Sequence, residues 1–282
     1  TLLAAPRPAQ KLVHIHAGAE ELGRVYAADL LVQASMRCAA PALAGLAPPD
    51  ARPWAGRTRA ARADYEANLQ VVPIDAKLSP LDMGVVVQTL QRVLDEAGAG
   101  DAILTNGAGN FTGWLQRHYR YPGMRHGGRT QLAPTSGAMG YGLPAAVAAA
   151  LLQPRRLAVN LAGDGDFLMN GQELATAMAY GARLIAIVVD NGSYGTIRMH
   201  QEREYPGRVS GSDLFNPDFA QFARAFGMAA DTVVETAQFE PAMRAALARP
   251  GPTLLHLKLP AEVSTSRATL SSIRAAARAQ GK

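Results

Sequence analysis

The stretch AVNLAGDGDFLMNGQELATAMAYGARLIAIVVDNGSYGTIR, residues 158–198, decides the fold of this chain. An apolar run at residues 157–162 is short enough for one buried strand, and residues 183–189 (RLIAIVV) predict a second. Between them the sequence GDGD (residues 163–166) is predicted to end the first strand. Residues 170–180 have helical spacing, and Gly181 ends that helix. A strand, a crossover helix and a second strand place two parallel strands in one sheet.

Two polar side chains, Asp164 and Asn191, each follow the end of one of these predicted strands. If the strands are neighbours, their ends lie roughly 5 Å apart. A carboxylate and an amide oxygen held there can share one small cation, and Mg²⁺ prefers oxygen ligands, with phosphates and water in its remaining positions. Gly163 and Gly165 let an anion approach the backbone, and the helix that follows offers its N-terminal amides. The pattern predicts a metal-bridged diphosphate site; the alternative is that GDG and DNG are ordinary turns.

The sequence G-D-G, followed by N-G-x-E-L-x-T-A and by an Asn at the end of the next strand, resembles the cofactor motif of thiamine diphosphate enzymes. Within that superfamily it is similar to the acetolactate synthase, benzoylformate decarboxylase and pyruvate decarboxylase family. The resemblance implies an α/β fold, a doubly wound parallel sheet with helices on both faces. It also implies that Asp164 and Asn191 bind Mg²⁺ through their side chains and Ser193 through its backbone carbonyl. The family usually has Asn-Asn where this chain has Asp190-Asn191, so the departure falls on the non-ligand position.

Residues 135–144 (TSGAMGYGLP) carry the second part of the resemblance. In the family, a backbone carbonyl here accepts a hydrogen bond from the aminopyrimidine, and an apolar side chain two residues later lies beneath the bend between the two cofactor rings. Those positions are Gly137 and Met139, which we assign as catalytic. A bulky side chain between the rings forces them together, so that the amino group reaches the thiazolium carbon. The alternative is that Met139 fills the core, the usual role of methionine.

A glycine-rich turn at residues 106–111 follows a predicted strand at residues 102–105. It is not the dinucleotide fingerprint, because no acidic residue stands about 20 positions further on at a strand end. In the family this turn lies against the diphosphate, although the acetolactate synthases have Gln-His near here and this chain does not. The predicted cofactor contacts are Gly109, Asn110, Gly137, Ala138, Met139, Gly163, Asp164, Gly165, Asp166, Asn191, Ser193, Tyr194, Gly195 and Thr196.

The chain is predicted to divide into four parts. Residues 1–46, with strands at 11–15 and 30–34 and a helix at 36–46, resemble the C-terminal part of the family's middle domain and form a fragment of a second α/β domain. Residues 47–75, rich in Pro, Ala and Arg, predict a linker with a polar helix near 59–69. Residues 76–265 predict the thiamine diphosphate pyrophosphate-binding domain, and residues 266–282 a C-terminal tail. Because the chain begins at Thr1, we expect that an upstream portion has been removed.

Further elements follow from periodicity and capping. Helices are predicted at residues 83–97, 143–152, 219–226 and 239–247, with another opening at residue 194, and a final strand at 253–259. His14 and His16 alternate on the first strand and suggest a metal pair, but no third ligand is nearby, so a structural role is favoured.

Composition narrows the functional class. A chain of 282 residues with 48% apolar content can bury a large core. Its longest low-polarity run, residues 142–152, is too short to span a bilayer. The single cysteine, Cys38, rules out an internal disulfide and predicts a reducing cytoplasm. The net charge of +5 does not predict nucleic-acid binding, because the basic residues are mostly Arg and do not interleave with aromatics; anionic small molecules are the expected partners.

The resemblance implies a lyase or transferase that uses thiamine diphosphate and Mg²⁺ to decarboxylate a 2-oxo acid and transfer the acyl carbanion to a second carbonyl. Ile197 stands where pyruvate decarboxylases have an active-site Glu, which favours carboligation over aldehyde release. In these enzymes a Glu on a separate pyrimidine-binding domain activates the cofactor. That domain is absent here, so we expect dependence on another segment or chain, in a homodimer or homotetramer, and no activity without it.

Three alternatives remain open. The first is that the chain is part of a benzoylformate-type decarboxylase that releases an aldehyde. The second is that it is part of a non-catalytic family member that serves as an assembly or regulatory module. An NAD-binding Rossmann protein is the weakest alternative. The sequence neither indicates nor excludes FAD, and it does not identify the 2-oxo acid.

Overall fold

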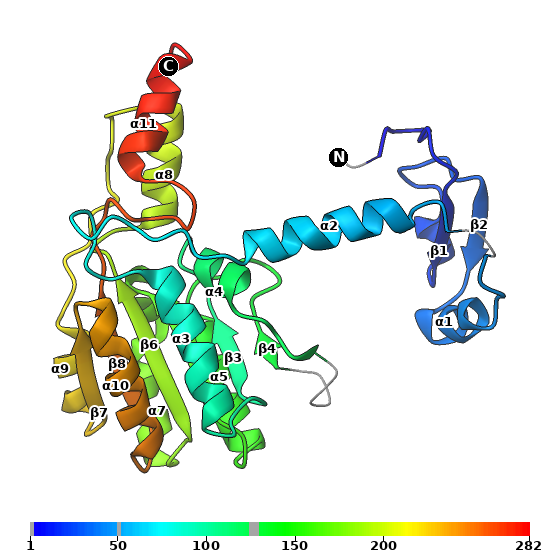
Figure 1. Ribbon diagram of the computed structural model, residues 1–282. Coiled ribbons are helices and arrows are strands. Elements are labelled where there is room, and N and C mark those ends of the chain that lie inside the picture. Colours follow the sequence, from blue (N-terminus) through cyan, green and yellow to red (C-terminus); the bar gives the residue numbers. More distant parts are fainter. Residues whose placement is uncertain (1–2, 50–51, 124–129) are drawn as a thin grey trace. The chain divides into compact units, whose positions relative to one another are not determined.

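The computed structural model describes residues 3–49, 52–123 and 130–282. The chain forms two compact units, Thr1–Ala63 and Asp64–Lys282 (Figure 1). The division falls inside the stretch predicted as a linker, residues 47–75. Small parts of the predicted first domain, linker and cofactor domain (residues 1–2, 50–51 and 124–129) lie outside the described residues.

The first unit contains a two-stranded parallel sheet, β1 (Val13–His16) with β2 (Leu30–Gln33), a short 3-10 helix η1 (Ala19–Glu21) and helix α1 (Met36–Ala44). These elements confirm the predicted strands and helix. Three apolar side chains of these strands, Val13, Leu30 and Leu31, are about half exposed, whereas parallel sheets are ordinarily covered on both faces. This exposure supports the proposal that the unit is a fragment of a larger α/β domain.

The two strand histidines bond to backbone rather than to each other. Nδ1 of His16 accepts a hydrogen bond from the N–H of Gly18 at 3.0 Å, and Nδ1 of His14 accepts one from Gly23 at 3.5 Å. Within the described residues, no three His, Cys, Asp or Glu side chains group so as to hold a metal ion. The structural role favoured for the pair stays a prediction. Helix α2 (Ala55–Asn68), which continues from the first unit into the second, has no buried residue.

The second unit is built on a six-stranded sheet in the order β4-β3-β5-β6-β8-β7, and every neighbouring pair is parallel. The strands are β3 (Ile103–Asn106), β4 (Gln131–Leu132), β5 (Ala158–Gly163), β6 (Leu184–Asp190), β7 (Ala229–Val233) and β8 (Thr253–Lys258). The sequence analysis missed β4, which has two residues, and β7, an edge strand with a mixed exposed and buried pattern.

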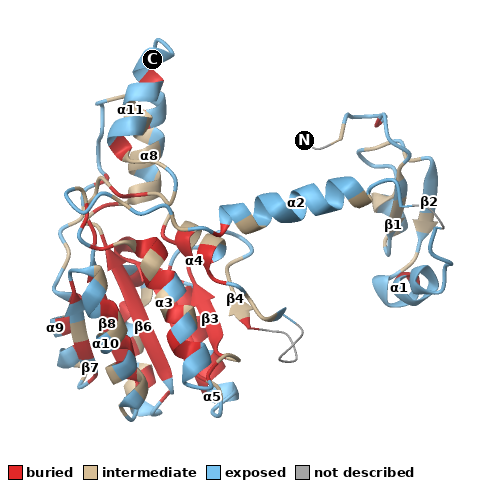
Figure 2. Ribbon diagram, in the orientation of Figure 1, coloured by how far each residue is buried: buried red, intermediate tan, exposed pale blue. Residues whose placement is uncertain are grey.

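Helices cover both faces of this sheet, which confirms the predicted fold class. Strand residues such as Leu104, Val159 and Ile187 pack with α3 (Met83–Glu96), α4 (Thr112–His118) and α10 (Thr236–Ala248). Their neighbours in sequence point to the other face, because side chains alternate along a strand. There they pack with α5 (Gly142–Leu152), α6 (Asp164–Asn170), α7 (Leu174–Ala179) and α9 (Phe219–Ala225). Figure 2 shows the central strands as an almost wholly buried layer.

The crossover between β5 and β6 differs from the predicted one. It begins at Asp164, immediately after β5, and runs as α6, a 3-10 turn η3 (Gly171–Glu173) and α7, rather than as one helix from Asn170. Gly163 has the extended conformation of an N-cap residue, and Phe167, which is 1% exposed, anchors the first turns in the core. Acidic residues favour a helix N-terminus, so the sequence GDGD starts the helix instead of breaking the chain.

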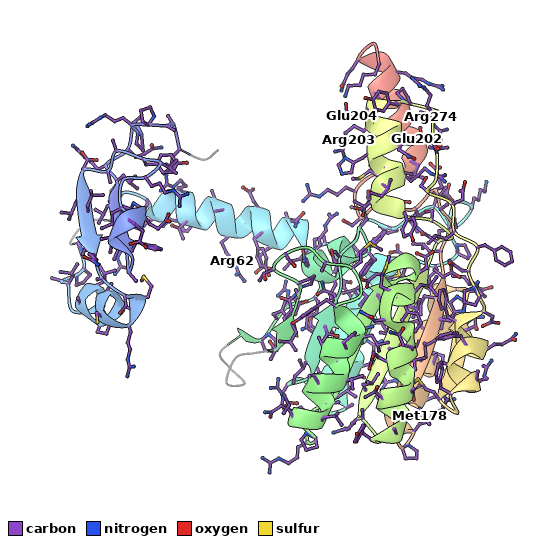
Figure 3. The ribbon with its side chains drawn as sticks, turned by 180° about the vertical axis from the view of Figure 1, so that it is seen from behind. Arg62, Met178, Glu202, Arg203, Glu204 and Arg274 are labelled. Atoms are coloured by element: carbon purple, nitrogen blue, oxygen red, sulfur yellow. The ribbon has the colours of Figure 1, made fainter. Side chains whose placement is uncertain are left out.

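Helices α8 (Gly195–Glu204) and α11 (Leu270–Ala279) pack against each other beyond the carboxyl ends of the strands, above the sheet in the view of Figures 1 and 3. Glu202 is 1% exposed, and Arg274 holds it with two hydrogen bonds of 2.7 and 2.5 Å. The Arg274 guanidinium lowers the pKa of Glu202 below its ordinary value of 4.5. The pair links the C-terminal helix α11 to α8, the helix that follows the loop after β6. Within the described residues, no helix is both long and apolar enough to cross a membrane.

This ion pair predicts an acid-dependent loss of stability. Because the pKa of Glu202 is lowered on folding, its contribution is complete above pH 4.5 and disappears as the pH falls through the lowered value. We expect Glu202→Gln to cost about 1–3 kcal/mol at pH 7, since charged hydrogen bonds are lost, and less at pH 3.5. Urea unfolding of both proteins at the two pH values measures the difference. An equal cost at both would show that the Glu202 charge does not stabilise the fold.

Candidate cofactor-binding site

A pocket of about 410 Å³ lies at the carboxyl ends of β3, β5, β6 and β8. The direction of strand addition changes beside β3, because β4 is added on one side of it and β5 on the other. Ligands of open α/β sheets bind at such a switch point, outside the carboxyl ends of the strands. The volume suits a small organic ligand.

The side chains of Asp164 and Asn191 converge at the ends of β5 and β6. These strands are paired in parallel, with Gly163 opposite Val189. The N–H of Ser193 donates to Oδ2 of Asp164 at 3.2 Å and to Oδ1 of Asn191 at 3.1 Å. The two oxygens are therefore neighbours on the same side of the sheet. The contact at Ser193 is made by its N–H, whereas the family resemblance assigns its carbonyl oxygen to the ion.

Asp164 is a buried carboxylate, 3% exposed. Burial raises its pKa, and the nearby Asp190 carboxylate acts in the same direction, against hydrogen bonds from the Gly165 amide and Asn216. A buried anion beside another anion is unfavourable unless a cation or strong donors balance it. This environment is one that a divalent cation would stabilise.

Asp190 differs from the usual Asn of the family, and its surroundings explain why an acid fits. His256 and Lys258 on β8 each bind Oδ2 of Asp190 at 2.8 Å, and Nδ2 of Asn216 donates to Oδ1 at 2.7 Å. Burial alone would raise the pKa of Asp190, but these partners outweigh it and lower the pKa. The same Nδ2 donates to Oδ2 of Asp164 at 2.8 Å, so Asn216 bridges the two carboxylates.

The glycines around Asp164 are also required by side-chain packing, a reason that the sequence did not indicate. A Cβ on Gly163 would lie 2.8 Å from the ring of Phe111, and one on Gly165 would lie 2.6 Å from the ring of Tyr194. Aromatic rings lie next to both residues, so a larger side chain would clash with them. The N–H of Gly165 donates to Asp164 Oδ1 at 2.8 Å, so this amide in the first turn of α6 is already engaged.

Hydrogen bonds join the glycine-rich turn after β3 to the start of α8. The hydroxyl of Thr196 accepts from the N–H of Asn110 at 3.0 Å and donates to Oδ1 of Asn110 at 3.1 Å. Both residues line the pocket, as does Ile197 in the first turn of α8. The predicted contacts Asn110, on the turn after β3, and Thr196, at the start of α8, therefore hold each other in place at the pocket wall.

Gly137 and Met139 line the same pocket from the segment before α5. Met139 is 38% exposed, so it is not the core filler that the alternative would require. Asp166 also lines the pocket and is 3% exposed. Burial raises the pKa of Asp166 to about 6, against opposing hydrogen bonds from the backbone of Gly140 and Ala108.

The pocket brings together every predicted cofactor contact except Ala138, which lies on the loop between Gly137 and Met139 without lining the pocket. Residues that the sequence analysis did not assign also line it: Ala108, Phe111, Trp114, Val189, Leu259 and Ser264. Ser264 follows β8, whose carboxyl end lies at the same edge of the sheet as those of β5 and β6. The parallel strand order is therefore the feature from which its place at the pocket could have been predicted. Phe111 and Trp114 flank the start of α4, a helix that was not predicted.

The residues present fit Mg²⁺ and a diphosphate. The donors that converge are a carboxylate oxygen and a carboxamide oxygen, which are the hard ligands that Mg²⁺ prefers. The Asp164 carboxylate is buried near a second carboxylate, and its hydrogen bonds come from neutral donors, the N–H groups of Gly165 and Ser193 and the amide of Asn216. A cation would add the balancing positive charge that neutral donors do not provide. Apolar side chains, among them Phe111, Trp114 and Met139, line the rest of the pocket and suit an organic ring.

Comparison with known proteins identifies the family of the second unit. Residues 107–257 match the family model for the C-terminal TPP binding domain of thiamine pyrophosphate enzymes. The acetolactate synthase large subunit of Parasynechococcus marenigrum (strain WH8102) is 31% identical over 256 residues, covering 88% of this chain and 39% of the relative. The acetolactate synthase isozyme 2 large subunit of Escherichia coli (strain K12) is 29% identical over 256 residues, covering 89% and 44%.

A solved structure, benzoylformate decarboxylase from Polynucleobacter necessarius, superposes with a TM-score of 0.61 at 25% sequence identity. The match covers 69% of this chain and 36% of that chain. The chain therefore belongs to the thiamine diphosphate-dependent enzymes and carries their C-terminal cofactor-binding domain, of the acetolactate synthase-like kind. It spans less than half the length of these relatives.

Proposed function

We propose that this chain is the Mg²⁺–thiamine diphosphate-binding part of an acetolactate synthase-like carboligase. The observation that carries the proposal is the convergence of Asp164 Oδ2 and Asn191 Oδ1 on the backbone N–H of Ser193, at the carboxyl ends of the paired strands β5 and β6. These oxygens and the Ser193 carbonyl would hold the ion, and the ion would hold the diphosphate. When bound, the cofactor supplies the electron sink for decarboxylation of a 2-oxo acid.

The chain's own residues would orient the cofactor and limit proton transfer. Met139 would hold the two rings in a bent arrangement, and the carbonyl of Gly137 would accept a hydrogen bond from the pyrimidine amino group. Ile197, at the pocket wall, has no proton to give. Without an acid there, protonation to a free aldehyde is disfavoured, and capture by a second carbonyl is favoured.

A 2-oxo acid decarboxylase is the second candidate, and the benzoylformate decarboxylase structure is the observation that favours it. The product separates the two candidates. A carboligase yields a hydroxyketone and a decarboxylase yields an aldehyde.

The proposed enzyme needs a pyrimidine-binding domain from another segment or chain, in a homodimer or homotetramer. Met139, Tyr141 and Met169, around Gly140, are between 38% and 47% exposed, although they are large and apolar. Such side chains suit a surface that another domain covers. The exposed free Cys38 fits the cytoplasmic location proposed from the sequence.

We expect the 282-residue chain alone to bind Mg²⁺–thiamine diphosphate weakly and to consume no 2-oxo acid, because the group that activates the pyrimidine is supplied elsewhere. A panel of 2-oxo acids, assayed on this chain and on the complete polypeptide with product analysis, tests the proposal. Turnover by the isolated chain would refute the dependence. A complete polypeptide that forms only aldehydes would refute carboligation.

A further inference from the structure

Helix α6 carries two polar side chains, Asp166 and Asn170, on one face, because residues four apart in an α-helix are neighbours on its surface. Oδ1 of Asp166 accepts a hydrogen bond of 2.7 Å from the N–H of Gly140. Nδ2 of Asn170 donates one of 2.8 Å to the carbonyl oxygen of Gly140. Both backbone polar groups of one residue are thus held by side chains of one helix.

Gly140 is the point at which residues 135–141, here called the wedge loop, attach to the sheet domain. It is buried, whereas residues 135–139 and Tyr141 are exposed. Its φ of +79° favours glycine, and a Cβ there would lie 2.6 Å from Met169 Cβ and 2.8 Å from Asn170 Nδ2. The loop therefore approaches α6 as closely as only a glycine allows.

The contacts of Asp166 argue against a role as a diphosphate ligand. A carboxylate repels a diphosphate at close range, and Oδ1 already accepts from Gly140. The carboxylate also lies against the turn after β3, since a Cβ on Gly107 would overlap it. One side chain therefore touches the wedge loop and the glycine-rich turn together.

We propose that Asp166 and Asn170 are positioning residues that clamp the wedge loop onto α6 and so fix Gly137 and Met139 relative to the metal-binding end of the pocket. The clamp itself needs no ligand. Its effect on the cofactor rings rests on the proposed function. The clamp would act on the ring end of the cofactor, whereas Asp164 and Asn191 would act on the diphosphate end.

Amide hydrogen exchange of the ligand-free 282-residue chain tests the clamp directly. We expect Asp166→Ala to speed exchange at Gly140 about tenfold or more, because a charged hydrogen bond is lost, and Asp166→Asn, which keeps the Oδ1 acceptor, to restore most of the protection. Of the two bonds to Gly140, Asn170→Ala removes only the one to the carbonyl oxygen. Faster exchange at the Gly140 N–H in this variant would therefore show that the two bonds act together. Leu168→Ala, an exposed position on the same helix, controls for a general weakening of α6.

Calorimetry with two ligands tests the consequence for the site. In the presence of Mg²⁺, we expect Asp166→Ala and Asn170→Ala to weaken binding of thiamine diphosphate several-fold more than binding of inorganic pyrophosphate, which has no rings for the wedge loop to contact. Equal weakening for both ligands would place Asp166 at the diphosphate end and overturn the positioning role. Unchanged exchange at Gly140 in both alanine variants would overturn the clamp. Absence of thiamine diphosphate binding by the unmodified chain would refute the proposed function, while the exchange result would still decide the clamp.

Discussion

Replacement of Asp164 by alanine is expected to weaken Mg²⁺-dependent binding of thiamine diphosphate more than about 100-fold, since changes in the partners of metal ligands alone typically cost 10–100-fold. Asp164 is the one carboxylate among the three proposed ligands, so its loss removes the negative charge that would balance the ion. Titration calorimetry of the chain with thiamine diphosphate, with and without Mg²⁺, measures the effect.

The substitution should leave the fold intact, which makes the result interpretable. Asn216 Nδ2 keeps its hydrogen bond to Asp190, and the Ser193 N–H keeps its bond to Asn191. Asp95→Ala, at an exposed position on α3 away from the pocket, is the matched control. If binding in Asp164→Ala stays within a few-fold of the control, the metal site is misplaced.

The same variant in the complete polypeptide separates an enzyme from a non-catalytic module. Loss of 2-oxo acid consumption in Asp164→Ala, with assembly unchanged, would show that the metal site serves catalysis. A complete polypeptide that consumes no 2-oxo acid even when unmodified, yet assembles with its partners, would support the regulatory role instead.

The sequence was most informative where a polar side chain able to bind a metal ion directly follows a strongly apolar strand. Asp164 and Asn191 each follow a strongly apolar strand, and parallel pairing brings such ends to one edge of the sheet. The convergence of these side chains could therefore be anticipated from local patterns. The α/β fold followed from the same strands and the crossover between them.

Contacts that depend on three-dimensional packing were not accessible in the same way. The sequence analysis gave Asn216 no role in the site. Its neighbour Asp218 caps α9 by accepting hydrogen bonds from the N–H groups of Ala220 and Gln221. The bridge from Asn216 to Asp164 and Asp190 spans segments that are remote in sequence. Whether a position requires glycine depends likewise on which atoms a Cβ there would contact. These atoms come from segments remote in sequence, so a local sequence pattern does not predict them.

Gly142, the first residue of α5, illustrates that dependence and predicts a large loss of stability. A Cβ there would lie 2.5 Å from Asn160 Oδ1 and 2.8 Å from both Asn106 C and Gly107 N, and two of these atoms are backbone. The Gly142 carbonyl also accepts a hydrogen bond of 2.8 Å from the hydroxyl of Thr105 on β3. The start of α5 therefore rests directly on the end of β3, and a methyl group cannot be accommodated by a side-chain rotation alone.

We expect Gly142→Ala to lower the free energy of unfolding by about 3 kcal/mol, the upper part of the range for overpacked cores, measured by equilibrium urea denaturation. Gly113→Ala, inside α4, is the matched control, because the nearest atom to its Cβ would be the Ser266 hydroxyl oxygen at 3.3 Å, the mobile end of a side chain. That variant should stay within about 0.5 kcal/mol of the unmodified chain. Equal stability of the two variants would mean that α5 does not approach β3 as closely as described. Asn106 and Gly107 lead directly into residues 108–111, which line the pocket. A displaced α5 should therefore also weaken thiamine diphosphate binding in Gly142→Ala, whereas Gly113→Ala should retain it.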